Sequence, residues 1–119
     1  MESDAAKTVL VIDDDEPIRE YLRFVLEEVG HTVVLARDGN EGLACFRKEV
    51  FDTVITDIAM PEKDGIDTII AMREIRPSTR IVAMSGLASK DKLLQIADMY
   101  GADAIMAKPF ERDEILLNV

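Results

Sequence analysis

Short apolar runs rich in valine and isoleucine alternate along the chain with longer amphipathic stretches. Runs that are apolar at nearly every position are typical of strands buried on both faces of a parallel sheet. Five such strands are predicted, near residues 7–12, 32–36, 53–57, 80–84 and 103–107. The alternation predicts an α/β domain in which helices connect successive strands.

The intervening stretches carry apolar residues at helical spacing, and glycine, proline and serine mark their ends. The predicted boundaries are Gly30 after the first helix, Gly39 and Glu49 for the second, Pro77 after the third, Ser89 and Gly101 for the fourth, and Glu111 at the start of the last. The side chains expected to face the sheet are Ile18, Tyr21, Leu22, Val25, Leu26 and Val29, then Leu43, Phe46 and Val50, then Ile66, Ile69 and Ile70, then Leu93, Ile96, Ala97 and Tyr100. Right-handed crossovers then predict a five-stranded, parallel, doubly wound sheet with helices on both faces.

Length and charge narrow the class of protein. The 119 residues are interpreted as one domain, 1–119, without a linker or repeat. A net charge of -10 repels polyanions, so direct binding of nucleic acid or of an anionic membrane is not expected. The single cysteine, Cys45, allows no internal disulfide and is interpreted as a packed thiol. The chain has no apolar stretch near the roughly 20 residues of a membrane span, and its acidic start is unlike a signal peptide, so we expect a cytoplasmic protein.

Charged residues follow three of the predicted strands. Asp13, Asp14 and Asp15 follow the first, Asp57 ends the third and Lys108 follows the fifth. Parallel strands end at one edge of a sheet, so these groups are expected to share a crevice. Carboxylates about 4 Å apart repel by roughly 4 kcal/mol at an effective dielectric of 20, which predicts a bound cation. An acidic metal pocket with one lysine suits phosphoryl chemistry.

Each of these residues also has a simpler interpretation. Asp15 and Glu16 are assigned to the N-terminus of the first helix, whose dipole favours acids. Ser85 could satisfy a loop amide, and Lys108 could be a solvated surface lysine. His31 stands at the start of a strand, away from the crevice, and is interpreted as structural or exposed.

Four motifs together resemble the receiver domain of two-component response regulators, which has a flavodoxin-like (βα)5 fold. They are VIDDDEP at 11–17, TDIAMPEKDG at 56–65, MSG at 84–86 and AKPF at 107–110. The resemblance implies a site for Mg²⁺, or Mn²⁺, and a cis peptide bond before Pro109. The implied roles are Asp57 as phosphoacceptor and metal ligand, Asp14 as direct ligand, Asp13 as a ligand mainly through water, the Ala59 backbone carbonyl as a further ligand, Ser85 as hydrogen-bond donor to the phosphoryl group and Lys108 as its ion-pair partner.

The resemblance implies a signalling module more than a turnover enzyme, with at most slow self-dephosphorylation. A sensor histidine kinase or a phosphotransfer protein would supply the phosphoryl group. Ser85 and Ile105 would then change the surface formed by the fourth helix, fifth strand and last helix, where an output domain or a second copy would bind. Ile105 departs from the Tyr or Phe common at this position, and the last helix is short, which would fit a trimmed chain or a lost output domain.

Two other functions stay open from the sequence. Asp13 and Asp15 could form the Asp-x-Asp pair of a phosphohydrolase of the haloacid dehalogenase kind, although Glu16-Pro17 does not match that family and Asp57 would be unexplained. A receiver-like adaptor that works without phosphate is the second alternative. The intact set of site residues speaks against it.

Overall fold

The computed structural model describes residues 6–58, 65–86, 95 and 100–119. In this part of the chain five parallel strands form one sheet in the order β2-β1-β3-β4-β5. The strands are β1 (Thr8–Ile12), β2 (Thr32–Ala36), β3 (Thr53–Asp57), β4 (Arg80–Ser85) and β5 (Ala104–Ala107). The predicted fold class and all five predicted strands are confirmed, with ends that differ by at most one residue.

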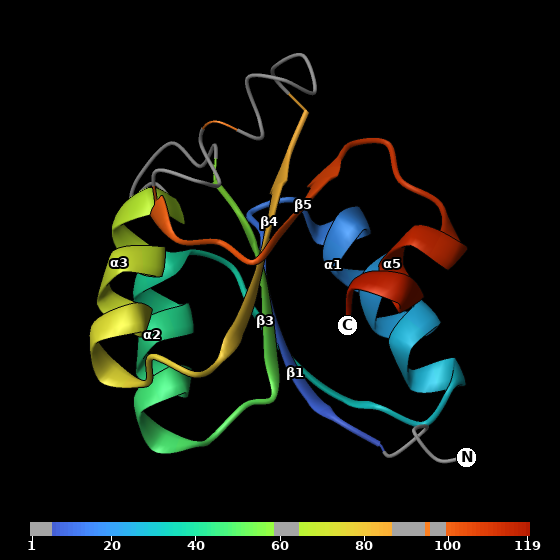
Figure 1. Cartoon of the computed structure of the whole chain (residues 1–119). Coiled ribbons are helices and arrows are strands. Elements are labelled where there is room, and N and C mark those ends of the chain that lie inside the picture. Colours follow the sequence, from blue (N-terminus) through green and yellow to red (C-terminus); the bar gives the residue numbers. More distant parts are fainter. Residues whose placement is uncertain (1–5, 59–64, 87–94, 96–99) are drawn as a thin grey trace.

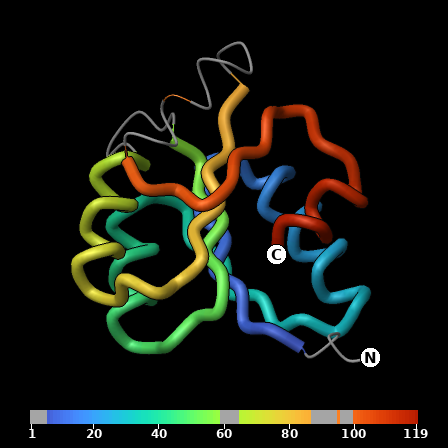
Figure 2. The backbone as a smooth tube through the Cα atoms, in the orientation of Figure 1, coloured from blue at the N-terminus to red at the C-terminus, as the bar shows by residue number. Residues whose placement is uncertain are grey.

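Helices cover both faces of the sheet, as Figure 1 shows with the sheet seen nearly edge-on. One face carries α2 (Gly39–Lys48) and α3 (Gly65–Ile75), and the other carries α1 (Glu16–Glu28) and α5 (Arg112–Asn118). The smooth trace in Figure 2 follows the crossovers from β1 through α1 to β2 and from β2 through α2 to β3. Of the predicted fourth helix, only Gln95 and Tyr100 are described, and both are helical. Its predicted cap Ser89 and the inward positions Leu93, Ile96 and Ala97 lie outside the described residues.

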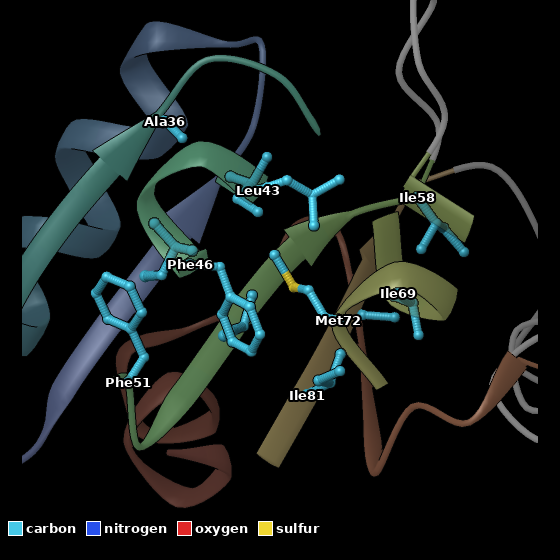
Figure 3. Close-up of a cluster of buried hydrophobic side chains, with 12 residues drawn as sticks. Ala36, Leu43, Phe46, Phe51, Ile58, Ile69, Met72 and Ile81 are labelled. Atoms are coloured by element: carbon cyan, nitrogen blue, oxygen red, sulfur yellow. The ribbon is translucent and has the colours of Figure 1, made fainter. Parts of the chain in front are cut away.

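The sheet separates two apolar cores. Phe46, Phe51, Ile69 and Met72 pack against β1, β3 and β4 in the core under α2 and α3 (Figure 3). The rings of Phe46 and Phe51 stack with their centroids 6.5 Å apart. Leu22, Val25, Leu26, Met106 and Ile115 belong to the core under α1 and α5. Both faces of β1 and β3 are buried, so β1 is apolar after Thr8, and in β3 the apolar Val54 and Ile55 lie between buried threonines.

Four residues predicted to face the sheet are exposed instead, namely Tyr21, Val29, Val50 and Ile70. Val29 and Val50 follow the last residues of α1 and α2, so helical spacing does not set their direction. In α1 the buried stripe is only Leu22, Val25 and Leu26. In α3 the stripe runs through Thr68, Ile69 and Met72, which leaves the adjacent Ile70 outside it. A helix on a sheet buries a narrower stripe than the apolar spacing suggested.

Candidate functional site

The register of the sheet brings the charged residues together at its carboxyl edge. Ile12 pairs with Thr56, so Asp13 and Asp57 come next to each other as β1 and β3 end. Asp57 pairs with Met84, and Ser85 pairs with Ala107, the residue before Lys108. The backbone N–H of Lys108 donates to the Ser85 carbonyl at 3.0 Å, which joins the ends of β4 and β5. The crevice predicted from the sequence is therefore present.

One ammonium lies between two buried carboxylates. Lys108 Nζ is 2.9 Å from Asp57 Oδ2, to which it donates a hydrogen bond. The same nitrogen is 2.9 Å from Asp13 Oδ2. Within the described part of the chain, this ammonium is the one charged partner of Asp13 Oδ2. Asp13 is wholly buried, Asp57 is 5% exposed and the Lys108 side chain is 21% exposed.

The pKa values of Asp13 and Lys108 both move upwards. Burial raises the pKa of Asp13, and the neighbouring Asp57 carboxylate adds to the rise, while Lys108 and the N–H of Asp15 oppose it. For Lys108, burial acts to lower the pKa, but the hydrogen bonds and charges of Asp57 and Asp13 together outweigh it and raise the pKa. The ammonium is thus held in its charged form by the carboxylates beside it.

Three carboxylates offer ligand atoms to a metal ion. Oxygens of Asp13, Asp14 and Asp57 all lie within 4.8 Å of one another, and Asp14 is exposed. One ammonium against three carboxylates leaves two negative charges, which a divalent cation would balance. Hard cations such as Mg²⁺ prefer carboxylate oxygen ligands, and Asp13, Asp14 and Asp57 bring three such groups together. The residues present therefore fit Mg²⁺ or Mn²⁺.

Of the other predicted site residues, Ser85 and Ile105 are described by the structure and Ala59 is not. Ser85 is buried at the end of β4. Ile105 is half-buried in β5 and packs against the core under α2 and α3. Ala59 lies outside the described residues, so its predicted ligand role stays a prediction. The peptide bond between Lys108 and Pro109 is cis, as the resemblance implied.

The structure also describes the residues that the sequence assigned to roles outside the site. Asp15 is exposed and precedes α1 as its N-cap residue, and Glu16 lies in the first turn of α1. His31 precedes β2 at the amino edge of the sheet, away from the crevice, and its Nδ1 accepts a hydrogen bond of 3.0 Å from the backbone N–H of Lys7. Cys45 is a free, half-buried thiol packed against the core under α2 and α3.

Two features of the site were missed from the sequence. Gly65, the last residue of the motif at 56–65, begins α3, and a Cβ there would collide with the backbone of Asp57 and Ile58. Arg19 donates from Nη1 to the carbonyl of Asp13 at 2.7 Å. An arginine near the start of an acidic helix is ordinarily exposed to solvent. The spacing of six positions between Asp13 and Arg19 is the one sequence signal for this contact.

An apolar groove of about 560 Å³ opens beside the site, between α1 and the segment after β5. It is lined by Pro17, Ile18, Tyr21, Gly86, Lys108, Pro109 and Phe110. The part of the chain that the structure describes holds no helix with the length and apolar character needed to cross a bilayer.

The model of the response regulator receiver domain family matches residues 9–119, so the chain belongs to this family. Receiver domains are signalling modules of two-component systems; as a family they bind Mg²⁺ at an acidic pocket and interact with histidine kinases and output domains. The resemblance to receiver domains that the sequence showed is thus confirmed.

Known proteins and solved structures agree with this assignment. The transcriptional regulatory protein DltR of Streptococcus agalactiae is 32% identical over 111 residues, covering 93% of this chain and 49% of DltR. The chain thus spans about half the length of that relative. The chemotaxis protein CheY4 of Vibrio cholerae is 34% identical with a TM-score of 0.84, covering 95% of this chain and 94% of CheY4. A CheY-like receiver domain protein of Methanospirillum hungatei is 29% identical with a TM-score of 0.87, covering 95% and 90%.

Proposed function

We propose that this receiver domain accepts a phosphoryl group on Asp57, with Mg²⁺ or Mn²⁺, from the phosphohistidine of a sensor histidine kinase or a phosphotransfer protein. The observation that carries the proposal is the ammonium of Lys108, 2.9 Å from carboxylate oxygens of both Asp13 and Asp57. A cation held at this position can pair with phosphoryl oxygens as soon as they enter. The groove beside Lys108 offers apolar contact to a protein donor.

The transfer needs alignment and charge neutralisation more than proton transfer. An oxygen of Asp57 forms a bond to phosphorus while the bond from phosphorus to the partner's imidazole nitrogen breaks, and its electron pair stays with the imidazole. Carboxylates are ordinarily ionised at neutral pH, so such a nucleophile needs no general base. Lys108 then exchanges part of its pairing with the carboxylates for pairing with the phosphoryl oxygens.

Asp13, Asp14 and Asp57 would hold the metal ion, together with the backbone carbonyl of Ala59, and Asp13 would bind mainly through water. A bound ion would supply charge neutralisation and alignment of the phosphoryl oxygens. Asp13 and Asp57 are buried and lie at strand ends, so their carboxylates are held in place before the ion arrives.

For the output, we propose that the hydroxyl of Ser85 donates to the phosphoryl group and that Ile105 responds. The surface of the predicted fourth helix, β5 and α5 would change and bind an output domain or a second copy. The backbone bond between Lys108 and Ser85 supports this route, because it couples the ends of β4 and β5. The domain would work in the cytoplasm, without binding nucleic acid itself, and its aspartyl phosphate would hydrolyse slowly.

Intact mass after incubation with acetyl phosphate and Mg²⁺ tests the acceptor. The parent chain should gain one phosphate, and Asp57→Asn should gain none. Equal labelling of both chains would exclude Asp57 as the acceptor. A parent that stays unlabelled while correctly folded would favour the adaptor that works without phosphate.

Amide chemical shifts with and without a beryllofluoride mimic test the output. Large changes should appear in residues 104–107 and 112–118. Changes confined to α1 and α2 would contradict the proposed route.

The phosphohydrolase alternative is disfavoured by the same geometry. Its pair would be Asp13 and Asp15, but Asp13 Oδ1 accepts the backbone N–H of Asp15 at 2.9 Å, and Asp15 itself is exposed. The receiver domain model also matches nearly the whole chain, residues 9–119. Turnover of a generic phosphate ester by the purified protein is the result that would revive it.

A further inference from the structure

The polar atoms of Asp13 are held from several directions. Its backbone N–H donates to the Ala36 carbonyl of β2 at 3.2 Å, and its Oδ1 accepts the N–H of Asp15 at 2.9 Å. Its Oδ2 lies beside the Lys108 ammonium. The backbone carbonyl of Asp13 accepts from Arg19 Nη1 at 2.7 Å. The turn that follows β1 is thus tied both to the end of β2 and to α1.

Arg19 contacts both ends of this acidic turn. Its backbone N–H donates to the Asp15 carbonyl at 3.1 Å, and its guanidinium donates to the Asp13 carbonyl. Asp14 stands between these two anchored residues and is exposed, so the position of its carboxylate depends on the backbone of the turn. A charged donor makes a shorter and stronger hydrogen bond than a neutral one, and a half-buried guanidinium is well suited to fix a carbonyl.

We propose that Arg19 is a positioning residue for the metal-binding carboxylates of Asp13 and Asp14. The inference rests on the proposed function, because it takes these two residues as ligands. Mg²⁺ demands near-ideal octahedral geometry, so a small rotation of the turn that carries two ligands lowers its affinity. Sites of this kind need ligands held within about 0.5 Å of the productive arrangement. Arg19 supplies that restraint from α1 without contacting the ion.

Charge and position predict opposite effects of removing Arg19. A cation near three carboxylates repels Mg²⁺, so loss of its charge alone would tighten metal binding. Loss of the restraint on the Asp13 carbonyl would weaken metal binding. The sign of the change therefore distinguishes a positioning role from a purely electrostatic one.

The experiment is a Mg²⁺ titration, monitored through amide chemical shifts. It compares the parent with Arg19→Gln, Arg19→Lys and Arg23→Gln. Arg23 lies one turn further along α1 and pairs with Glu20, so Arg23→Gln removes the same charge from the same helix. Arg19→Gln should raise the Kd for Mg²⁺ about tenfold, the effect of about 1.4 kcal/mol. Arg19→Lys should lie between Arg19→Gln and the parent, because lysine keeps the charge and one donor. Arg23→Gln should bind Mg²⁺ as tightly as the parent or more tightly.

Arg19→Gln that stays folded and binds Mg²⁺ at the parent's Kd or below would overturn the inference. If Arg19→Gln does not fold, Arg19→Lys decides: a Kd raised about threefold supports positioning, and the parent's Kd contradicts it. Failure of the proposed function looks different, because the parent itself would then bind no Mg²⁺ or accept no phosphate.

Discussion

Replacing Arg73 with methionine should destabilise the domain by about 2 to 3 kcal/mol. The guanidinium at the end of α3 donates to the Gly101 carbonyl from Nε at 2.9 Å and from Nη2 at 2.7 Å. Its Nη1 donates to the carbonyls of Pro77 at 2.9 Å and Thr79 at 2.6 Å. Its Nη2 also pairs with Asp103 Oδ2 at 2.6 Å. Arg73 therefore ties α3 to the turn before β4 and to the segment before β5.

The magnitude follows from what water can replace. Gly101 and Pro77 are exposed, so their carbonyls can be hydrated after the substitution. Thr79 is buried, and leaving its carbonyl without a donor costs about 1 to 3 kcal/mol. The ion pair with Asp103, whose side chain is 41% exposed, contributes up to about 1 kcal/mol. Methionine retains the apolar stem, so lost packing adds little.

Urea unfolding followed by far-UV circular dichroism measures the effect, since the chain has no tryptophan. With a slope of about 1 to 3 kcal/mol per molar, the midpoint should fall by about 0.7 to 3 M while the slope stays constant. The control is Arg23→Met, which removes only an exposed pair with Glu20 and should change stability by less than about 0.5 kcal/mol. Equal midpoints for Arg73→Met and Arg23→Met would refute the reasoning.

Three further substitutions test the site and the amino edge of the sheet. Gly65→Ala should lose about 1 to 3 kcal/mol and slow phosphorylation, because its Cβ collides with the backbone of Asp57, whereas Gly86→Ala meets only ordinary contact and should stay near the parent in urea unfolding. Lys108→Met should bind Mg²⁺ more tightly yet accept less phosphate, since the ammonium competes with the ion for two buried carboxylates; weaker Mg²⁺ binding in a titration would contradict this. Burial and a nearby lysine lower the pKa of His31, so the parent should lose stability as pH falls below about 6.5, where the unfolded chain takes up the proton first. His31→Asn keeps a hydrogen-bond acceptor that does not titrate. If its stability differs from that of the parent by the same amount at pH 7.5 and pH 5.5, His31 does not cause the loss of stability.

The fold and the core of the site were predictable for the same reason. Strands buried on both faces are mostly apolar, so the charged residues at or just after their carboxyl ends mark where each strand ends. Asp13, Asp57 and Lys108 are such residues, and the common direction of parallel strands places them at one edge. The site followed from the strand pattern without knowledge of any contact.

The details that escaped prediction depend on contacts between distant segments. Tyr21 and Ile70 have the right spacing to face the sheet, but the width of the contact with the sheet leaves them exposed. Arg19 and Arg73 look like solvated helix residues, because most of their acceptors are backbone carbonyls, which every residue has. No side-chain pattern in a sequence marks which carbonyl lacks a partner.

This use of arginine also bears on the surface of the domain. Several of the cations on the described part of the chain turn their charge towards backbone carbonyls instead of towards surface acids. These are Arg19 to Asp13, Arg76 to Phe46 and Arg80 to Asn118. Arg73 donates to the carbonyls of Pro77, Thr79 and Gly101 and also pairs with Asp103. Lys108 is likewise committed to the two buried carboxylates. With 14 basic against 24 acidic residues in the sequence, the acids outnumber the bases that could pair with them. Asp15 and Glu16 are exposed beside the site, so we expect this edge of the sheet to attract basic protein surfaces and to repel acidic ones.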